Sequence, residues 1–189
     1  MKRTSFANTA CPIARSLEHV GDWWNILILR DAAYGLTRFD HFQKALGIGT
    51  AMLTRRLNQL VKAGLLSKSR YSAHPPRYEY LLTERGREFR QVLFAFVQFG
   101  NRHYAPEGES ILVGERKTGS PIDLGLCERS TGRQVQPEEL GIVEGPAANE
   151  IIKLRLALAG GDIAPDDFVE KLSVLRPPSK ARSKRMVTA

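Results

Sequence analysis

Apolar residues recur at spacings of three and four along the first hundred residues, and this period predicts a series of short helices. We expect helices over residues 12–20, 23–33, 38–46 and 50–62. The second segment is apolar almost all round, which is typical of a buried central helix. Gly47-Ile48-Gly49 makes a tight connection between the third and fourth helices.

The period changes after Gly64, which is a natural helix stop. Residues 65–71 and 77–82 are each predicted to be strands, joined by a loop containing Pro75-Pro76, since two prolines cannot continue a ladder. Thr83 can cap one further helix that runs to about residue 102. A helix, a glycine turn, a second helix and then a hairpin form the winged helix-turn-helix arrangement.

The composition changes beyond Pro106, where Gly, Pro and short β-prone pieces alternate through residue 146. The β-prone pieces lie at 111–113, 124–127 and 134–135, and helices are predicted over 147–159 and 165–175. The predicted fold class is therefore mainly α with a small β-hairpin wing, plus an α+β C-terminal extension. We divide the chain into a DNA-binding and dimerisation domain at 1–104, the extension at 105–176, and a basic tail at 177–189 that we expect to be disordered.

Charge is distributed unevenly along a chain whose net charge is +8. Residues 1–104 carry 16 Lys and Arg against 7 Asp and Glu, whereas residues 105–175 carry 7 against 13. A basic first domain favours a polyanionic partner, most often nucleic acid. The alternative is a solvated basic surface, and charge alone does not separate the two.

The polar face of the 50–62 helix carries hydroxyl, amide and guanidinium side chains, which are the types that contact base edges in the major groove. An ordinary exposed face usually includes acids, and residues 41–78 contain none. The start of this helix also favours phosphate through its free N–H groups. The candidate DNA-binding residues are Arg38, Thr50, Ala51, Thr54, Arg55, Arg56, Asn58, Gln59, Lys62, Arg70, His74 and Arg77, with Lys44 and Lys68 as further candidates for phosphate contacts.

The last helix of this domain has more apolar surface than one side of a small domain needs. We expect Phe89, Leu93 and Phe96 to form a homodimer contact, because two-fold regulators bind two half-sites of a pseudo-palindromic operator. Ordinary core packing is the alternative for these residues.

Several stretches in this order resemble the HxlR family of bacterial winged-helix regulators. They are Cys11-Pro12-Ile13-Ala14-Arg15, Trp23 to Asp31, Gly35 with Arg38-Phe39, Leu53-Thr54-Arg55-Arg56-Leu57, Gly64-Leu65, and Pro75 to Gly86. The resemblance covers about residues 10–100 and implies a homodimeric repressor or activator, often responsive to electrophiles or oxidants. Two features depart from it: Gly49 stands where the family usually has Ser, and the chain continues for about 85 residues past the winged helix.

Cys11 is the candidate sensor thiol, because several family members have their redox-sensing cysteine at this position. Arg15 lies one helical turn further on, and a basic neighbour favours the thiolate. The alternative is a small buried residue that packs the first helix, since free cysteine is among the most buried residue types.

Other classes of protein find little support in the sequence. The four histidines and two cysteines have no zinc-ligand spacing, and the chain has no phosphate-binding glycine loop or nucleophile elbow. We therefore expect no metal, no cofactor and no enzymatic activity. The chain lacks an apolar run long enough for a membrane span and an apolar leader, so we expect a cytoplasmic protein. Expected partners are double-stranded DNA, a second copy and a small-molecule effector. The remaining alternative is a winged helix that binds another protein.

Overall fold

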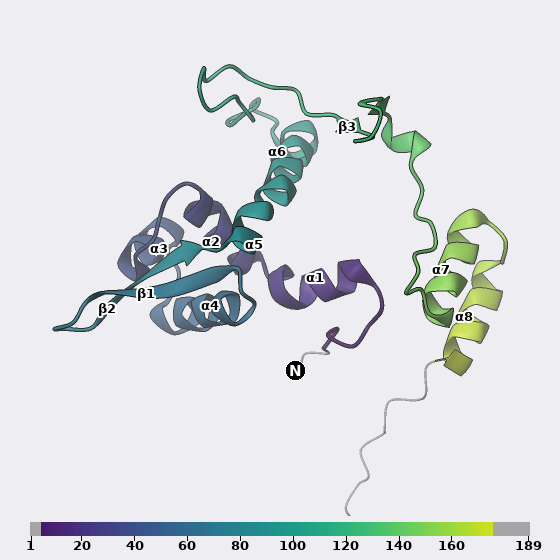
Figure 1. Ribbon diagram of the computed structural model, residues 1–189, viewed down its shortest axis with the longest axis horizontal. Coiled ribbons are helices and arrows are strands. Elements are labelled where there is room, and N and C mark those ends of the chain that lie inside the picture. The colour runs from purple at the N-terminus through teal and green to yellow at the C-terminus, as the bar shows by residue number, and fades with distance from the viewer. Residues whose placement is uncertain (1–4, 176–189) are drawn as a thin grey trace, which may run out of the picture. The chain divides into compact units, whose positions relative to one another are not determined.

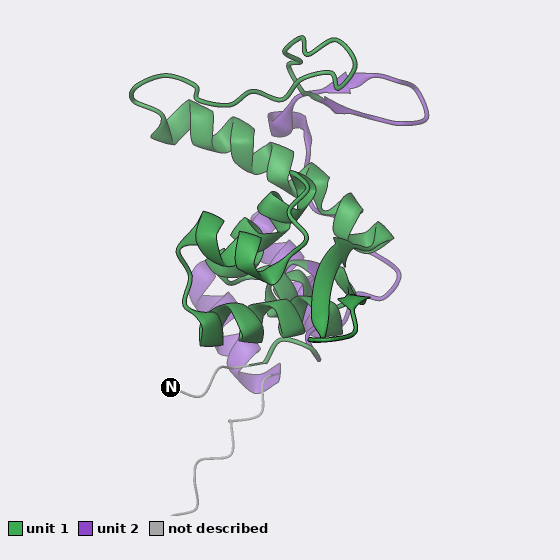
Figure 2. Ribbon diagram, turned by 90° about the vertical axis from the view of Figure 1, so that its left-hand side faces the viewer, with its two compact units in different colours: residues 1–7, 13–125 green, residues 8–12, 126–189 purple. Residues whose placement is uncertain are grey.

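The computed structural model describes residues 5–175 and contains two compact units (Figure 2). Unit 1 comprises residues 1–7 and 13–125, and unit 2 comprises residues 8–12 and 126–189. None of the helices within residues 5–175 combines the length and apolar character that a membrane span requires. The predicted basic tail at 177–189 lies outside the described residues.

Unit 1 is a winged helix whose elements follow the predicted order (Figure 1). They are α1 (Pro12–Val20), α2 (Trp23–Ala33), α3 (Phe39–Leu46), α4 (Thr50–Lys62), β1 (Leu66–Ser72), β2 (Arg77–Leu82), α5 (Glu84–Glu88) and α6 (Arg90–Tyr104).

The sequence predicted one continuous helix after the wing. This prediction is wrong in one respect, because the structure has two helices that meet at Phe89. The α5 segment is held close to the start of β1, and the Phe89 side chain packs against the core. Phe89 thus ends α5 and begins α6.

Helix α2 forms the centre of the core, as its pattern predicted. Ile28 and Leu29 are fully or almost fully buried, and α2 contacts α3, α4, α6 and β2. Asp22 caps the helix by accepting a hydrogen bond from the Trp24 N–H at 3.1 Å. Trp23 departs from the pattern, because it is 70% exposed.

The wing is the antiparallel pair β1–β2, in register from Leu66 opposite Leu82 to Arg70 opposite Tyr78. The register shifts between Arg70 and Ser72. The base of the wing is tied to its neighbours through Thr83. Its hydroxyl donates to the Gly64 carbonyl at 2.6 Å and accepts from the Gly86 N–H at 3.1 Å.

Residues 105–125 have little regular structure and follow α6 within unit 1. Two amides of the helix hold them: Gln98 Nε2 donates to the Leu124 carbonyl at 2.8 Å, and Asn101 Nδ2 donates to the Ile111 carbonyl at 2.9 Å. The β-prone piece at 111–113 forms no strand, and an isolated bridge joins Gly114 to Pro121.

Unit 2 has the mixed α and β character predicted for the extension. It contains a short hairpin, β3 (Leu126–Cys127) and β4 (Gln134–Val135), a 3₁₀ turn (Pro137–Glu139), and the helices α7 (Glu150–Gly160) and α8 (Pro165–Leu175), which pack against each other. Helix α7 begins three residues later than predicted, because Asn149 caps it by accepting from the Ile152 N–H at 3.0 Å.

Candidate nucleic-acid interface

Helix α4 has one buried and one exposed face. Leu53, Leu57 and Leu60 are fully buried and fix the helix to the core. The predicted contact residues on the opposite face are all exposed: Thr50, Ala51, Thr54, Arg55, Asn58 and Lys62. The structure therefore leaves a polar, acid-free helix face open to solvent.

The start of α4 is compatible with close approach of a ligand. Gly49 is its N-cap and has no side chain to accept a hydrogen bond. The first backbone N–H groups of α4 are therefore not bonded to a cap side chain. Thr50 accepts from Gln43 Nε2 at 2.8 Å, and the Thr54 hydroxyl donates back to the Thr50 carbonyl at 2.8 Å. These two bonds restrain the small side chains at the helix start.

The structure contradicts one of the predicted DNA-contact residues, Arg56, because this side chain is buried. It is only 7% exposed, and its Nη2 lies 2.5 Å from Asp22 Oδ2. Arg56 occupies the inward stripe between Leu53 and Leu57, so its guanidinium serves an intramolecular ion pair and cannot reach a phosphate. Its helical spacing was the signal that sequence reasoning missed. Gln59 is partly buried and accepts a hydrogen bond from Arg56 Nη1 at 3.1 Å.

Two cations lie over tyrosine rings of the wing, one from the start of α3 and one from β1. The Arg38 guanidinium lies 4.8 Å from the centre of the Tyr71 ring, and the Lys68 ammonium lies 4.0 Å from the centre of the Tyr78 ring. Such stacking is attractive and leaves the charged group facing outward. The two tyrosines are the functional candidates that sequence reasoning missed.

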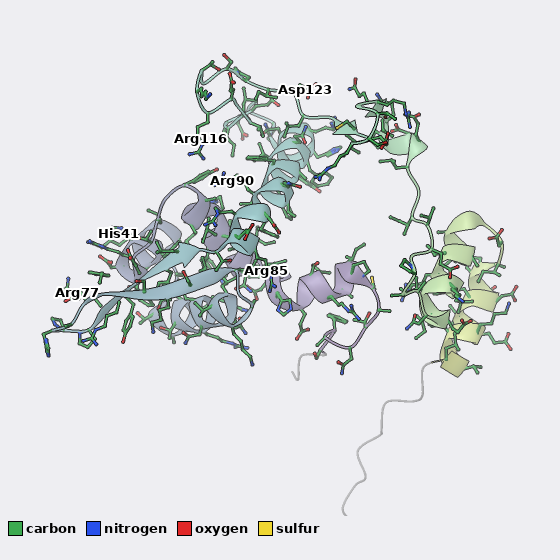
Figure 3. The ribbon with its side chains drawn as sticks, viewed as in Figure 1. His41, Arg77, Arg85, Arg90, Arg116 and Asp123 are labelled. Carbon is green, nitrogen blue, oxygen red and sulfur yellow. The ribbon has the colours of Figure 1, made fainter. Side chains whose placement is uncertain are left out.

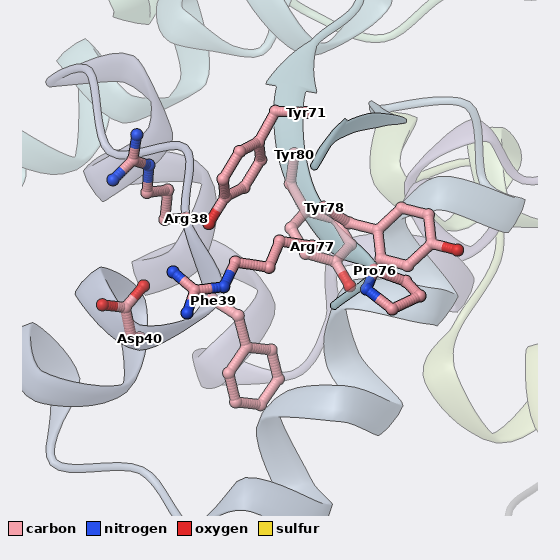
Figure 4. A pocket seen from close by; sticks show the side chains of 8 residues that line it. All are labelled: Arg38, Phe39, Asp40, Tyr71, Pro76, Arg77, Tyr78 and Tyr80. Carbon is pink, nitrogen blue, oxygen red and sulfur yellow. The ribbon is translucent and has the colours of Figure 1, made fainter. Parts of the chain in front are cut away.

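Between the wing and the start of α3 lies an open cavity of about 470 Å³ (Figure 4). Arg38, Phe39 and Asp40 form the α3 side, and Tyr71, Pro76, Arg77, Tyr78 and Tyr80 form the wing side. Burial and the neighbouring Tyr78 raise the pKa of Tyr80, so its hydroxyl stays neutral at physiological pH. The cavity thus combines aromatic walls with two guanidinium groups.

The remaining predicted wing residues are exposed near its tip. Arg70 donates to the carbonyls of Ser72 and Ala73 at 3.0 and 2.6 Å and so closes the turn of the wing. His74 and Arg77 are exposed. Figure 3 shows Arg77 on the wing and His41 on α3 at one end of unit 1, away from Arg90 and Arg116.

The predicted interface helix divides into core and surface residues. Phe89 packs against the core, which is the alternative that the sequence left open, and Leu93 is half-buried. Phe96 is 50% exposed and lies in a stripe with exposed Val92 and Phe99. Helix α1 adds the exposed Ile13 and Leu17.

Cys11 and Cys127 are both free thiols in unit 2. Cys11 is half-buried, and its N–H donates to the Thr9 hydroxyl at 3.0 Å, whereas Cys127 is exposed. Within residues 5–175, no three His, Cys, Asp or Glu side chains come together as metal ligands.

Comparison with known proteins identifies the same part of the chain. The family described as HxlR-like helix-turn-helix matches residues 19–108. The uncharacterized HTH-type transcriptional regulator Rv3095 of Mycobacterium tuberculosis is 38% identical over 132 residues, which cover 67% of this chain and 84% of that protein. A second uncharacterized HTH-type regulator, sll1512 of Synechocystis, is 39% identical over 108 residues, 56% of this chain and 80% of the relative.

Two solved structures extend the likeness beyond the winged helix. PA1374 of Pseudomonas aeruginosa, a candidate transcription factor, is 52% identical with a TM-score of 0.58 and covers 77% of this chain and 99% of its own. PA1607, also a candidate transcription factor, is 35% identical with a TM-score of 0.67 and covers 75% of this chain and 100% of its own. A match over 77% of the chain passes residue 125 wherever it begins, so part of unit 2 is shared.

Proposed function

This chain belongs to the HxlR-like helix-turn-helix family of transcriptional regulators, and from that premise we propose that it represses transcription as a homodimer bound to a specific DNA sequence. The observation that carries the proposal is the exposed, acid-free face of α4 beside a wing with cations stacked on tyrosines. In this arrangement α4 contacts base edges in the major groove, and the wing contacts the sugar–phosphate backbone.

The contact residues that we propose are those that the structure leaves exposed. Arg55 and Asn58 would contact bases from the middle of α4, and Thr50, Ala51 and Thr54 allow its start to approach the groove. Lys62, Arg38 and Arg77 would contact phosphate. Arg56 is left out of this interface because it is buried.

A second copy would associate through the apolar stripe of Val92, Phe96 and Phe99 on α6 together with Ile13 and Leu17 on α1. These side chains are 44–68% exposed. Exposed apolar side chains that recur along one face of a helix are candidates for an interaction site in a soluble protein. Two-fold pairing would present two α4 helices to successive turns of the DNA, which requires a pseudo-palindromic operator.

Effector response remains a hypothesis that rests on Cys11 and on the family resemblance. Oxidation or alkylation of this thiol would weaken DNA binding, and the half-burial of Cys11 also fits a packing role. A Cys11→Ser variant that binds DNA and responds to diamide as the parent does would exclude the sensor.

The alternative function is a winged helix that binds another protein. A protein-binding surface has no reason to exclude acids, whereas residues 41–78 contain none. Salt separates the two functions, because each phosphate contact releases counterions and binding to DNA weakens steeply as salt rises.

The test is fluorescence anisotropy of the full chain on its own upstream intergenic DNA, with a shuffled duplex as control, at two salt concentrations. We expect tight, salt-sensitive binding to the native duplex. Arg55→Ala should weaken that binding by about 5- to 100-fold, the range for loss of one base contact. Arg116→Ala removes another exposed charge, near α6, and should change the affinity by less than about twofold. Equal binding to native and shuffled DNA would refute sequence-specific recognition.

A further inference from the structure

The side-chain amide of Gln59 is oriented by a hydrogen bond that its oxygen accepts. Arg56 Nη1 donates to Gln59 Oε1 at 3.1 Å. Because a guanidinium carries donors only, the amide atom facing it must be the oxygen. Within the part of the chain that the structure describes, no partner takes the two hydrogens of Gln59 Nε2. The side chain therefore offers its donor group and keeps its acceptor engaged.

Arg56 is itself fixed from the opposite side. It is buried, and its Nη2 pairs with Asp22 Oδ2 at 2.5 Å. The other oxygen of Asp22 accepts from the Trp24 N–H and caps α2. A continuous set of hydrogen bonds thus runs from the N-terminus of the central helix through Asp22 and Arg56 to Gln59.

Gln59 lies at the edge of the exposed face of α4. It is partly exposed, whereas Leu60 beside it is fully buried and Asn58 is exposed. At this edge a side chain with a fixed hydrogen-bonding direction can contact DNA as the helix enters the groove.

Resting on the proposed function, we propose that Gln59 is a specificity-determining residue that contacts a base as a hydrogen-bond donor only, and that Arg56 and Asp22 are its positioning residues. A free glutamine amide pairs with adenine by donating to N7 and accepting from the N6 amino group. Arg56 is buried and draws Oε1 toward the inner side of α4. The oxygen has a second lone pair, but in this orientation Gln59 presents its NH₂ group rather than its oxygen to a base at the exposed face. Guanine presents acceptors at both N7 and O6, so Gln59 selects guanine over adenine.

The first test changes Gln59 alone. Binding is measured on the native duplex and on a set of duplexes in which each base pair is replaced in turn. Gln59→Met should lose the preference for guanine at one position, with a loss of affinity of about 5- to 10-fold for the native duplex. Gln59→Glu keeps the shape and the bond to Arg56 but has no donor, so it should lose the same preference.

The second test removes the positioning pair. The double variant Asp22→Asn with Arg56→Met removes both charges of the ion pair together and keeps a side-chain oxygen at residue 22 to cap α2. A single change would leave a buried charge. The variant should keep the parent's far-UV circular dichroism and salt dependence. With Oε1 released, discrimination of guanine from adenine at the Gln59 position should fall by about 5-fold or more, while other positions stay unchanged.

The outcomes separate the inference from the proposed function. A parent that binds native and shuffled DNA alike overturns both. A selective parent whose double variant folds and keeps the same base preferences overturns the positioning role. If the double variant does not fold, Gln59→Glu decides: parental base preference in that variant overturns the donor-only contact. A uniform loss on all duplexes with Gln59→Met would assign Gln59 to phosphate and also overturn the inference.

Discussion

Gly86 and Gly100 both lie in helices, yet the structure predicts opposite effects when each becomes alanine. A Cβ on Gly86 would lie 2.1 Å from the Leu65 carbonyl oxygen and 2.9 Å from a methyl of Leu82. Real Cβ contacts are essentially never shorter than 3.0 Å, so α5 would have to move by about 1 Å. A Cβ on Gly100 would have no heavy atom within 4 Å apart from its own helix and neighbours.

The loss of stability in Gly86→Ala can be estimated from the contacts that a movement of α5 would disrupt. Overpacking against backbone costs about 1–3 kcal/mol. The Gly86 N–H also donates to the Thr83 hydroxyl, and loss of such a cap costs about 1 kcal/mol. We therefore expect Gly86→Ala to lower the free energy of unfolding by about 2–4 kcal/mol. Gly100→Ala should raise it by about 0.5–1 kcal/mol, because glycine is a poor helix residue.

The assay is urea unfolding of parent and both variants at one protein concentration, followed by circular dichroism and tryptophan fluorescence. The free energies of unfolding of the two variants should differ by about 2.5–5 kcal/mol. A Gly86→Ala protein within about 0.5 kcal/mol of the parent would refute the close packing of α5 against β1. A destabilised Gly100→Ala would show that the open side of α6 is occupied.

Three further predictions concern the interface, the wing and the extension. Phe96→Glu places a charge on the exposed stripe of α6, and we expect monomers by sedimentation at concentrations where the parent is dimeric; an unchanged dimer would exclude this stripe. Tyr71→Leu removes the ring beneath Arg38 and should weaken binding to every DNA sequence by about 2- to 5-fold, whereas Tyr71→Phe should bind like the parent. Hydrogen bonds from Ser130, and then from Thr131, lower the pKa of Glu128 to about 2. Because this folded-state pKa is depressed, the turn is stabilised above about pH 4.5 and loses that contribution as pH falls through about 2, which carboxyl NMR titration would detect; an ordinary titration near pH 4.5 would refute those bonds.

Local periodicity was sufficient to predict the helices and the hairpin of unit 1. In α4, for example, the buried positions Leu53, Leu57 and Leu60 recur at helical spacing, so one face had to turn inward. The identity of the exposed face followed from the same pattern. These features depend on residues close together in the chain.

The features that escaped prediction depend on residues far apart. Arg56 was counted among the basic residues that surround α4 in sequence, whereas its partner Asp22 caps a different helix. The break at Phe89 reflects the close approach of Gly86 to Leu65, which no helical pattern contains. The β-prone piece at 111–113 forms no strand, and a short apolar run does not show whether a partner strand lies beside it.

The hydrogen bonds of Thr83 determine which segments of unit 1 unfold together. The Thr83 hydroxyl joins the end of α4 at Gly64 to the start of α5 at Gly86, and the Thr83 N–H donates to the Leu65 carbonyl at 3.1 Å. The wing base cannot separate from α5 without breaking all three bonds together. The amide protons of Thr83 and Gly86 should therefore exchange through the same opening. Once each rate is divided by its intrinsic rate, the two should give one free energy of opening, as members of a single cooperative folding unit.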